Sequence, residues 1–473
     1  MDNKKYCSVS KKCSGCQLSN MDYRRQLRFK QNEVRIRFNR LCSVQKILGA
    51  EKPLNYRNKA QFMFRKVKGR TASGIYQSAD KTVVITDSCA LHTKEQNEVA
   101  KVLCSLFDSF KIEPYDLHKR RGLVKSVIVR QSFHTGELMV VIVCDYKGNF
   151  PSEKTFAQSL VEQIPKVASV ILTKHRGTTI TQGEHPKVIY GKASITDRIC
   201  SLDFIISYNS FFQINPMQTE VLYSTAVKMA ELTKEDTVLD AYSGTGTIGM
   251  ICAPLCKQVY SVELNENAVK DARENKRINN IDNVSLVCAD SEEYIEALAQ
   301  DNSPLDVALL DPPRAGCSRS FLTALCRLSP KRIVYISCNM DTQVRDVRYL
   351  LKNGYELKKV QGVDMFPFTK HTETVILLSR KDVRERIKFD VNVEDLHGRA
   401  SSTATYSEIK AYILEKYGLK VSSLYIAQIK DKCGFEKREN YNIGEGKSKE
   451  LICPPEKEQA IMDAFRHFGM LRD

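Results

Sequence analysis

A strand, a glycine-rich turn and the start of a helix follow one another between Thr237 and Gly249. The glycines of this segment are Gly244, Gly246 and Gly249. Glycines there let the backbone approach a nucleotide-like ligand closely, because a Cβ would collide with it. The pattern predicts the first strand–turn–helix unit of a doubly wound α/β domain.

Later strand-like runs continue this unit in the order of a doubly wound sheet. Val259 to Val262 leads to Glu263, 23 residues after Asp240, where a carboxylate can accept hydrogen bonds from both hydroxyls of a ribose. The next run ends at Asp290. Nicotinamide-dependent enzymes share these steps, so they leave the ligand open.

A fourth run, Val307 to Leu310, ends in Asp311-Pro-Pro-Arg. The two prolines lock the backbone immediately outside the sheet and give a rigid platform beside the reactive end of the ligand. Dehydrogenases have no need of that platform, whereas S-adenosylmethionine enzymes that methylate a base use such a turn to hold the base. The turn therefore favours a methyltransferase, with a purely structural turn as the alternative.

A cysteine stands at the end of the next β-branched run, Arg332 to Asn339. Ile333, Val334 and Ile336 favour a buried strand, so the thiol of Cys338 is expected at the carboxyl edge of the sheet. Ligands bind at that edge in open α/β sheets. A nucleophile is the functional interpretation, and a buried structural cysteine is the simpler one.

Three cysteines crowd together near the start of the chain: Cys7, Cys13 and Cys16. Gly15 allows the tight turn that lets neighbouring sulfurs face one centre, which is typical of a soft-metal site. The candidates for a fourth ligand are Cys42, Cys89 and Cys104. Spacing alone leaves iron–sulfur and zinc open, although structural zinc usually takes two Cys-x-x-Cys pairs and the second pair is missing.

The chain length and charge bound the possibilities. At 473 residues it exceeds the size at which one hydrophobic core keeps growing, so about two to four domains are expected. A formal net charge of +16 attracts phosphate backbones or anionic membrane surfaces. Residues 1–10 lack the apolar core of a secretory signal and no apolar run could span a bilayer, so we expect a cytoplasmic protein with reduced thiols.

The rest of the chain divides by pattern. Residues 1–205 read as a mainly antiparallel, β-rich α+β module with the cysteine site, residues 206–382 as the catalytic domain, and residues 383–473 as a helical extension. In the first module, basic residues from Arg24 to Arg40 predict a solvated helix face. Arg57 and Lys59 start a half-buried strand and could meet a nucleic-acid backbone. The extension is expected to pack on the enzyme, and its lysines motivate the hypothesis of an RNA or ribosome contact.

Together the motifs resemble the uracil-5-methyltransferases of RNA, specifically the iron–sulfur-containing branch that acts on 23S ribosomal RNA. The resemblance runs from Cys7 to about Arg380. It also rests on Phe211-Phe-Gln-Ile-Asn, on Ser337-Cys-Asn and on Met365-Phe-Pro-Phe-Thr-Lys-His-Thr-Glu. It implies a class I S-adenosylmethionine-dependent methyltransferase domain preceded by a β-rich iron–sulfur module.

The resemblance also implies roles for individual residues. Cys338 would be the nucleophile and Glu373 the base that accepts the C5 proton. Contacts with S-adenosylmethionine would come from Gln213, Tyr242, Glu263 and Asp311, and further from Thr247 and Asp290. A [4Fe–4S] cluster would be held by Cys7, Cys13, Cys16 and Cys89. The product would be 5-methyluridine in 23S ribosomal RNA, made by a monomer with no membrane partner.

The chemistry explains why a cysteine is needed. Carbon 5 of uracil is a poor nucleophile, and thiolate addition at C6 creates an enolate that makes C5 nucleophilic. Nearby cationic charge, such as Arg314, would favour the thiolate. The C5 proton must then leave, and Glu373 is the only carboxylate in its motif. The uridine must be unpaired or flipped out, and Phe62 or Phe211 could stack on it.

The sequence departs from the family in three places. Met340 stands where proline is common, and Phe368 where histidine is common. We expect the chain to lack the small β-barrel RNA-binding domain that many members carry ahead of the cysteines, so RNA affinity is expected to come from elsewhere. The tRNA-acting branch is expected to lack the cluster, which favours ribosomal RNA. A tRNA uracil-5-methyltransferase and a non-catalytic RNA-binding assembly factor are the alternatives, and the intact Cys338 and Glu373 argue against the second.

Overall fold

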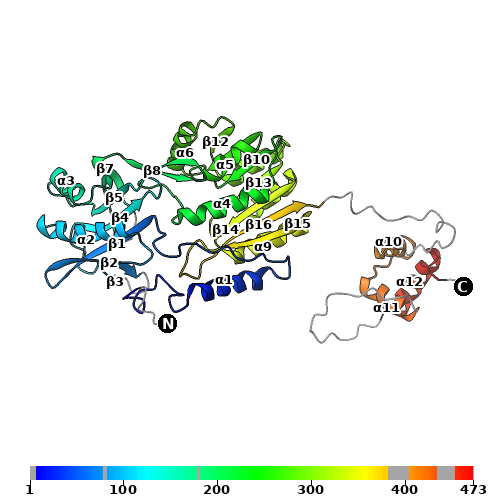
Figure 1. Ribbon diagram of the computed structural model, residues 1–473. Coiled ribbons are helices and arrows are strands. Elements are labelled where there is room, and N and C mark those ends of the chain that lie inside the picture. Colours follow the sequence, from blue (N-terminus) through cyan, green and yellow to red (C-terminus); the bar gives the residue numbers. More distant parts are fainter. Residues whose placement is uncertain (1–6, 78–81, 178–181, 382–403, 434–452, 472–473) are drawn as a thin grey trace. The chain divides into compact units, whose positions relative to one another are not determined.

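The computed structural model describes residues 7–77, 82–177, 182–381, 404–433 and 453–471 (Figure 1). The chain forms two compact units, Met1–Lys381 and Asp382–Asp473. In the described parts of the chain, no helix is long and apolar enough to cross a membrane.

The first sheet of the larger unit has seven strands in the order β3-β2-β1-β4-β5-β6-β7. Neighbouring strands are antiparallel except for β5 and β6. The strands are β1 (Lys59–Val67), β2 (Arg70–Gln77), β3 (Thr82–Ile85), β4 (Val124–Gln131), β5 (Leu138–Asp145), β6 (Val167–His175) and β7 (Glu184–Gly191). Helices α2 (Lys94–Ser109) and α3 (Glu153–Gln163) share a core with one face of this sheet. The mainly antiparallel, β-rich α+β pattern read from the sequence is confirmed.

The second sheet has the order β12-β11-β10-β13-β14-β16-β15, with β10 to β14 parallel and β16 antiparallel to both neighbours. Its strands are β10 (Thr237–Ala241), β11 (Gln258–Glu263), β12 (Val284–Cys288), β13 (Val307–Leu310), β14 (Arg332–Ser337), β15 (Tyr355–Val363) and β16 (Glu373–Arg380). The strand order reverses between β10 and β13, and such switch points are where α/β sheets bind ligands. The predicted doubly wound sheet is confirmed.

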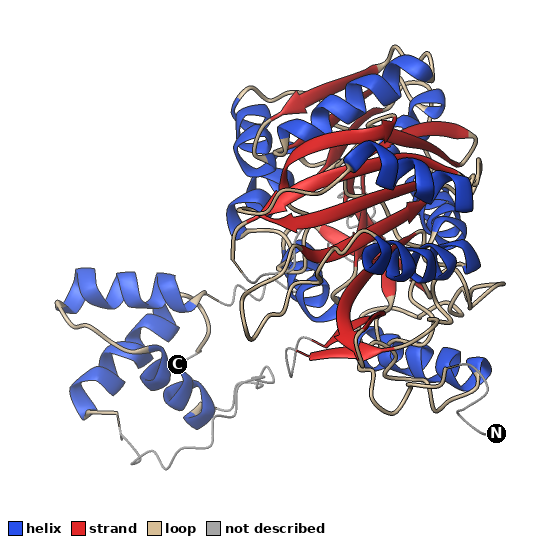
Figure 2. Cartoon of the chain, turned by 90° about the vertical axis from the view of Figure 1, so that its left-hand side faces the viewer, coloured by secondary structure: helices blue, strands red, loops and turns tan. Residues whose placement is uncertain are grey.

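Helices cover both faces of the second sheet, as Figure 2 shows. One face carries α4 (Pro216–Ala230), α5 (Thr247–Cys252) and α6 (Glu266–Ile278), and the other carries α1 (Tyr23–Phe38), α7 (Ser291–Gln300), α8 (Arg319–Leu328) and α9 (Met340–Lys352). The hairpin of β8 (Ser194–Ile199) and β9 (Leu202–Ser207) packs into the core on the α4 face. That core also contains Ile128 and Met139 of the first sheet, so one apolar cluster joins the two sheets.

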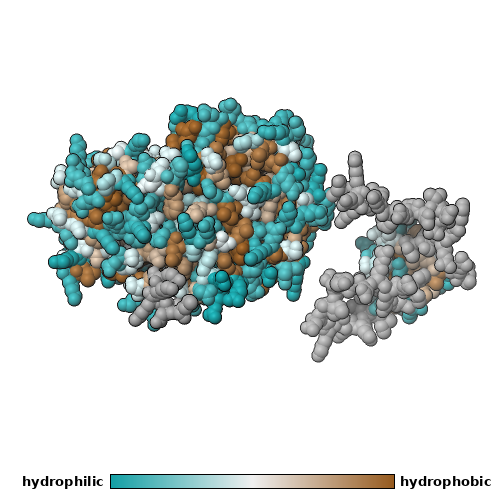
Figure 3. Space-filling model, in the orientation of Figure 1, coloured by the Kyte–Doolittle hydropathy of each residue, from teal (hydrophilic) through white to brown (hydrophobic). Residues whose placement is uncertain are grey.

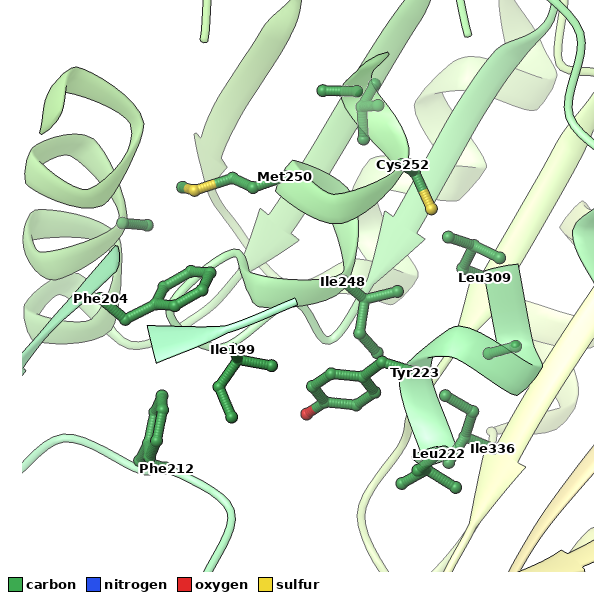
Figure 4. Close-up of a cluster of buried hydrophobic side chains, with 14 of the residues drawn as sticks. Ile199, Phe204, Phe212, Leu222, Tyr223, Ile248, Met250, Cys252, Leu309 and Ile336 are labelled. Carbon is green, nitrogen blue, oxygen red and sulfur yellow. The ribbon is translucent and has the colours of Figure 1, made fainter. Parts of the chain in front are cut away.

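Figure 4 shows part of this shared core, including Ile199 of β8, Tyr223 of α4 and Ile248 of α5. On the face drawn in Figure 3, hydrophobic residues form several patches among the hydrophilic residues of the larger unit. The division at residue 205 stays a prediction, and the shared core means that the two parts bury apolar surface against each other.

Helix α1 corrects one expectation from the sequence. The basic run does form a helix with exposed arginines, but its face at Gln26, Lys30, Val34 and Phe38 is buried. Lys30 Nζ donates to Asp364 Oδ1 (2.5 Å) and to the carbonyls of Phe366 (3.0 Å) and His371 (2.8 Å). These residues precede β16, so a helix near the start of the chain holds the segment that leads into Glu373.

The smaller unit consists of α10 (Tyr406–Tyr417), α11 (Ser423–Lys432) and α12 (Pro455–His467). They pack around a core of Ile409, Ile413, Ile426, Ile461 and Phe465. Thr405 caps α10 through a reciprocal pair of hydrogen bonds with Glu408, and Gly418 ends it in the left-handed conformation. The helical character expected of this extension is confirmed for its described residues.

Replacing Lys30 by methionine is expected to lower the free energy of unfolding of the larger unit by about 3–5 kcal/mol, because it leaves the buried Asp364 carboxylate without its cationic partner. Urea denaturation followed by circular dichroism measures the effect. Arg28→Met, on the exposed face of the same helix, is the matched control and should change stability by less than about 0.5 kcal/mol. Equal effects of the two substitutions would contradict a stabilising role for the buried pair.

Candidate active site

A cavity of about 630 Å³ opens at the switch point of the second sheet. It is lined by seven of the residues that the sequence singled out: Gln213, Tyr242, Thr247, Glu263, Asp311, Cys338 and Glu373. They come from the ends of different strands, from the loop before α4 and from the start of α5. The fold thus brings together residues that are up to 160 positions apart in the sequence.

The glycine-rich turn and Glu263 form one wall. Glu263 at the end of β11 accepts hydrogen bonds from the backbone N–H of Gly244 (2.9 Å) and of Asn265 (2.8 Å). Gly244 and Gly246 have φ of +57° and +76°, and Tyr242 has the left-handed φ of +64°. Non-glycine residues rarely adopt that conformation, and it occurs often at functional sites. The turn is therefore held in shape by the carboxylate that was expected to bind the ribose.

A second carboxylate lies beneath the turn. The buried Asp240 accepts from Gly249 N–H (2.9 Å) and Ser261 Oγ (3.2 Å), and burial raises the pKa of Asp240 to about 7. A Cβ at Gly249 would lie 2.7 Å from Asp240 Oδ2 and 2.4 Å from Ser261 Oγ. Gly249 is therefore needed so that α5 can start directly above these side chains.

The opposite wall joins the Asp-Pro-Pro-Arg turn to the cysteine. Asn339 Nδ2 and Thr342 Oγ1 both donate to the Arg314 carbonyl, at 2.9 and 3.1 Å. Asn339 also caps α9, which begins at Met340. Proline suits the first position of a helix, and here the asparagine cap starts the helix with methionine in that place.

The electrostatics around Cys338 differ from the expectation. Arg314 lowers the pKa of the thiol through a side-chain hydrogen bond, as expected, but burial and the nearby Glu373 raise it by more, so the net pKa is raised. Glu373 is only 5% exposed, and burial together with Asp311 raises its pKa to about 8 against the opposing effect of Arg314. Burial also raises the pKa of Asp311 to about 7. At neutral pH most of the Glu373 side chains therefore carry a proton, which removes the repulsion on the thiolate.

The rim of the cavity is formed by the loop before α4. Asn58 fixes this loop, because its N–H donates to the Ile214 carbonyl and its Nδ2 to the Gln213 carbonyl, both at 2.9 Å. Phe211 lies on the rim with 71% of its surface exposed. The expectation that Phe62 could stack on a base is wrong, because Phe62 is 3% exposed and packs against His92 and the first sheet.

Some residues of the site were not predicted from the sequence, and one predicted residue lies outside the cavity. Tyr223 of α4 lines the cavity and interacts with Gln213 and Asp311. The apolar pattern of the helix gave no sign that this tyrosine belongs to the site. Arg57 lines the cavity, and its Nε is buried with no hydrogen-bond partner among the described residues. Asp290 caps α7 by accepting from the N–H groups of Glu292 and Glu293 and is not among the cavity-lining residues. Its contact with the cofactor stays a prediction.

Cys7, Cys13, Cys16 and Cys89 line a separate cavity of about 40 Å³. Its other walls include Leu54, Ile75 and the family-departing Phe368, which is 6% exposed. Burial, followed by Cys89 and Cys13, raises the pKa of Cys16 to about 12. Within the described parts of the chain, no three His, Cys, Asp or Glu side chains are arranged closely enough to hold a metal ion. The thiols thus surround a small space without converging on one point.

Comparison with known proteins identifies the family. Residues 22–381 match the family described as tRNA (Uracil-5-)-methyltransferase. The chain belongs to this family. An RNA methyltransferase of Clostridium tetani is 38% identical over 378 residues, which cover 79% of this chain and 82% of that protein. One of Listeria innocua is 37% identical over 379 residues, covering 79% and 83%.

Among solved structures, the tRNA (uracil-54, C5)-methyltransferase of Pyrococcus abyssi in complex with S-adenosyl-L-homocysteine is similar, with a TM-score of 0.66 and 28% identity. The match covers 77% of this chain and 86% of that one. The fold is therefore that of a class I S-adenosylmethionine-dependent methyltransferase, as the sequence predicted. The chain is a member of the RNA uracil-5-methyltransferases, with RNA as substrate and S-adenosylmethionine as methyl donor.

Proposed function

We propose that this member of the family methylates C5 of a uridine in 23S ribosomal RNA through a covalent bond between Cys338 and C6. The observation that carries the proposal is that Cys338 and Glu373 line one cavity with Asp311 and Arg314, at the switch point of the sheet. A nucleophile, a base and a cation beside the nucleophile are the groups that this reaction requires.

The residues act in a fixed order. Cys338 Sγ bonds to C6, and the electron pair of the C5–C6 double bond moves into an enolate that makes C5 nucleophilic. Bound S-adenosylmethionine supplies the methyl group. Glu373 then takes the proton from C5, the electron pair re-forms the C5–C6 bond, and the bond from C6 to Sγ breaks to release the thiolate. Glu373 must lose its own proton before it can act, and its raised pKa makes it a strong base once ionised.

The cofactor-binding residues fit an S-adenosyl ligand. Glu263 presents carboxylate oxygens beside the glycine-rich turn, and Thr247 lies at the start of α5. Gln213, Tyr242 and Asp311 line the same cavity. We expect the exposed Phe211 to stack on an unpaired or flipped-out base, and Arg57, which lines the same cavity, to contact the RNA backbone.

The four cysteines support a [4Fe–4S] cluster. Cluster irons lie between the thiolates, so the ligand sulfurs surround a space, whereas a single zinc needs all four within about 2.3 Å of one point. Cys7, Cys13, Cys16 and Cys89 line one cavity, and this is the observation behind the proposed ligand set. A bound cluster would hold these cysteines as thiolates and serve a structural role.

Ribosomal RNA is preferred over tRNA on the strength of the cysteine set, which the tRNA-acting branch is expected to lack. The similar Pyrococcus abyssi enzyme acts on tRNA, so a tRNA substrate is the second candidate. The expectation of a cytoplasmic monomer stays a prediction.

Transcripts of 23S ribosomal RNA that contain 5-fluorouridine should form a covalent complex with the protein, because fluorine at C5 cannot leave as a proton does. Cys338→Ala should abolish the complex and turnover. Glu373→Gln should lower turnover about 10²- to 10⁴-fold and accumulate a methylated adduct on ordinary RNA. Denaturing gel electrophoresis and mass spectrometry of the complex measure both.

Cys288→Ala, at an exposed cysteine outside the cavity, is the matched control and should behave as the wild type. Wild-type turnover by Cys338→Ala would overturn the mechanism. A covalent complex with fluorinated tRNA but not with fluorinated 23S ribosomal RNA would overturn the choice of ribosomal RNA and leave the mechanism intact.

The pH dependence follows from Glu373. Because the pKa of Glu373 is raised to about 8 and the base must be ionised, kcat/KM should rise at least tenfold per pH unit between pH 6 and 7.5. It should keep rising above pH 8, because the pKa of the Cys338 thiol is raised as well and the thiolate is the nucleophile. Loss of tritium from [5-³H]uridine RNA, with both substrates below saturation, measures this profile. A profile that is flat from pH 6 upward would mean that Glu373 is ionised throughout.

Anaerobically purified protein should contain about four irons and four sulfides per chain and be brown. Cys89→Ser should lose most of this iron. Cys104→Ser is the control, because Cys104 does not line the cysteine cavity. Zinc in place of iron, or iron retained by Cys89→Ser, would contradict the proposed ligand set.

A further inference from the structure

A second concave surface lies in the first sheet, outside the catalytic cavity. It is a groove of about 770 Å³ between the β1–β2 hairpin and the loop that follows α2. The groove is lined on one side by Arg65 and Lys66 and on the other by His118, Lys119 and Arg121. We refer to it as the basic groove.

The first wall is the end of the β1–β2 hairpin, where Arg65, Lys66, Lys68 and Arg70 are exposed within six residues. Asp108 at the end of α2 fixes this wall. Its carboxylate accepts from Thr71 N–H (3.0 Å), Thr71 Oγ1 (2.6 Å) and Lys66 Nζ (2.6 Å). Asp108 is therefore occupied by the hairpin, as is Lys66, which also lies 3.9 Å from Glu113.

The second wall is a closed loop from Asp116 to Arg121. Asp116 N–H donates to the Arg121 carbonyl (2.8 Å), and Asp116 Oδ1 accepts from the N–H groups of His118 and Lys119, both at 2.9 Å. Gly122 lets the two ends meet, since it has φ +117° and a Cβ there would lie 2.3 Å from the Pro114 carbonyl. The loop therefore presents its basic side chains from a constrained backbone.

The charge of the groove is unbalanced. Six exposed basic residues around it form no ion pair with any carboxylate of the described residues: Arg65, Lys68, Arg70, Lys119, Arg120 and Arg121. Of the acidic residues nearby, Asp108 and Asp116 direct their oxygens at the hairpin and at the loop backbone. Glu113 is the exposed carboxylate that remains. Like charges gathered in this way repel one another, and a bound polyanion relieves the repulsion.

Two aromatic residues of the groove, Phe64 and Tyr115, are 2% and 9% exposed, so neither offers a face on which a base could stack. The exposed lining side chains include four guanidinium or ammonium groups, those of Arg65, Lys66, Lys119 and Arg121, beside one imidazole and one carboxylate. Guanidinium and ammonium groups bind phosphate oxygens and carry no base-specific information by themselves. The groove therefore fits a phosphodiester backbone better than it fits unpaired bases.

Strand β1 connects the groove to the catalytic cavity. Arg57, two residues before β1, lines the cavity, and Arg65 lies eight residues further along the chain. At about 3.3 Å per residue the two sites are about 26 Å apart. Figure 1 likewise places β1 and β2 at a distance from β10 and β13, whose ends form the cavity. An RNA with its target uridine in the cavity can span this separation.

We propose that the basic groove is an RNA-backbone site, which binds phosphates of the substrate RNA remote from the methylated uridine. The site holds the RNA irrespective of local sequence and leaves recognition of the uridine to the catalytic cavity. The inference rests on RNA being the substrate and not on which RNA is methylated. An acidic protein segment is the competing occupant, and the family's RNA substrate favours the first.

The test uses the full-length protein and its Lys119→Gln/Arg120→Gln/Arg121→Gln variant, with ribosomal RNA and tRNA transcripts titrated at several salt concentrations. The variant should bind RNA about 10- to 100-fold more weakly, and the slope of log Kd against log salt should fall by about one for each phosphate that the protein no longer neutralises. The KM for RNA should rise while kcat at saturating RNA stays unchanged, because the groove touches no reacting atom. Arg65→Gln/Lys68→Gln/Arg70→Gln on the opposite wall should behave alike.

Arg327→Gln/Arg348→Gln/Lys352→Gln is the matched control, which removes three exposed basic groups from α8 and α9, outside both the cavity and the groove. Its RNA affinity and salt slope should stay within about twofold of the wild type. Equal effects in the control and in the groove variants would mean that RNA binding depends only on the net charge of the protein, and they would overturn the proposal. Unchanged RNA binding in the groove variants would also overturn it, even if they no longer bound polyglutamate. Because binding is read without methyl transfer, this outcome is separate from a failure of the proposed reaction.

Discussion

The catalytic cavity depends on an ion pair that lies outside it. Lys30 and Asp364 are both fully buried and join the helix α1 to the segment before β16. The ammonium group has three acceptors, and Asp364 also accepts from Tyr23 Oη (2.9 Å). A buried charge is tolerated only when it is paired and hydrogen-bonded in this way. The pair therefore fixes the position of the segment that ends at Glu373, which apolar packing alone would leave less defined.

Buried charged groups also need partners inside the catalytic cavity. Asp311 and Glu373 are carboxyl groups in a poorly solvated space, and burial raises the pKa of both. For Glu373 the charge of Asp311 adds to the effect of burial, and Arg314 opposes it. The raised pKa of Glu373 suits a base, and protonation of that group also favours the thiolate of Cys338. The protonation states of Cys338 and Glu373 thus depend on each other.

The fold and most of the cavity could be predicted from the sequence because their signals are local. The turn around Gly246, the acidic residue Glu263 and the strand before Cys338 each follow from spacing within one unit of the sheet. Lys30 could not be assigned in the same way, since its partners lie over 330 positions away. Its position four residues before the apolar Val34 and eight before Phe38 was the available signal for a buried face. Phe62 was misjudged for a different reason: it lies on the buried face of the half-buried strand that starts near Arg57, and a base cannot reach that face.

The cysteine site and the catalytic segment are parts of one packed structure. Phe368, four residues after Asp364, lines the cysteine cavity, and its carbonyl accepts from Leu18 N–H (3.0 Å), two residues after Cys16. Tyr56 Oη donates to the neighbouring carbonyl of the same segment at 3.1 Å. A group bound by the thiols would restrict the cysteine loop, and through these contacts it would restrict the approach to Glu373. Such a group would therefore act on the base through packing and without electron transfer, and the apolar Phe368 suits a wall of its cavity.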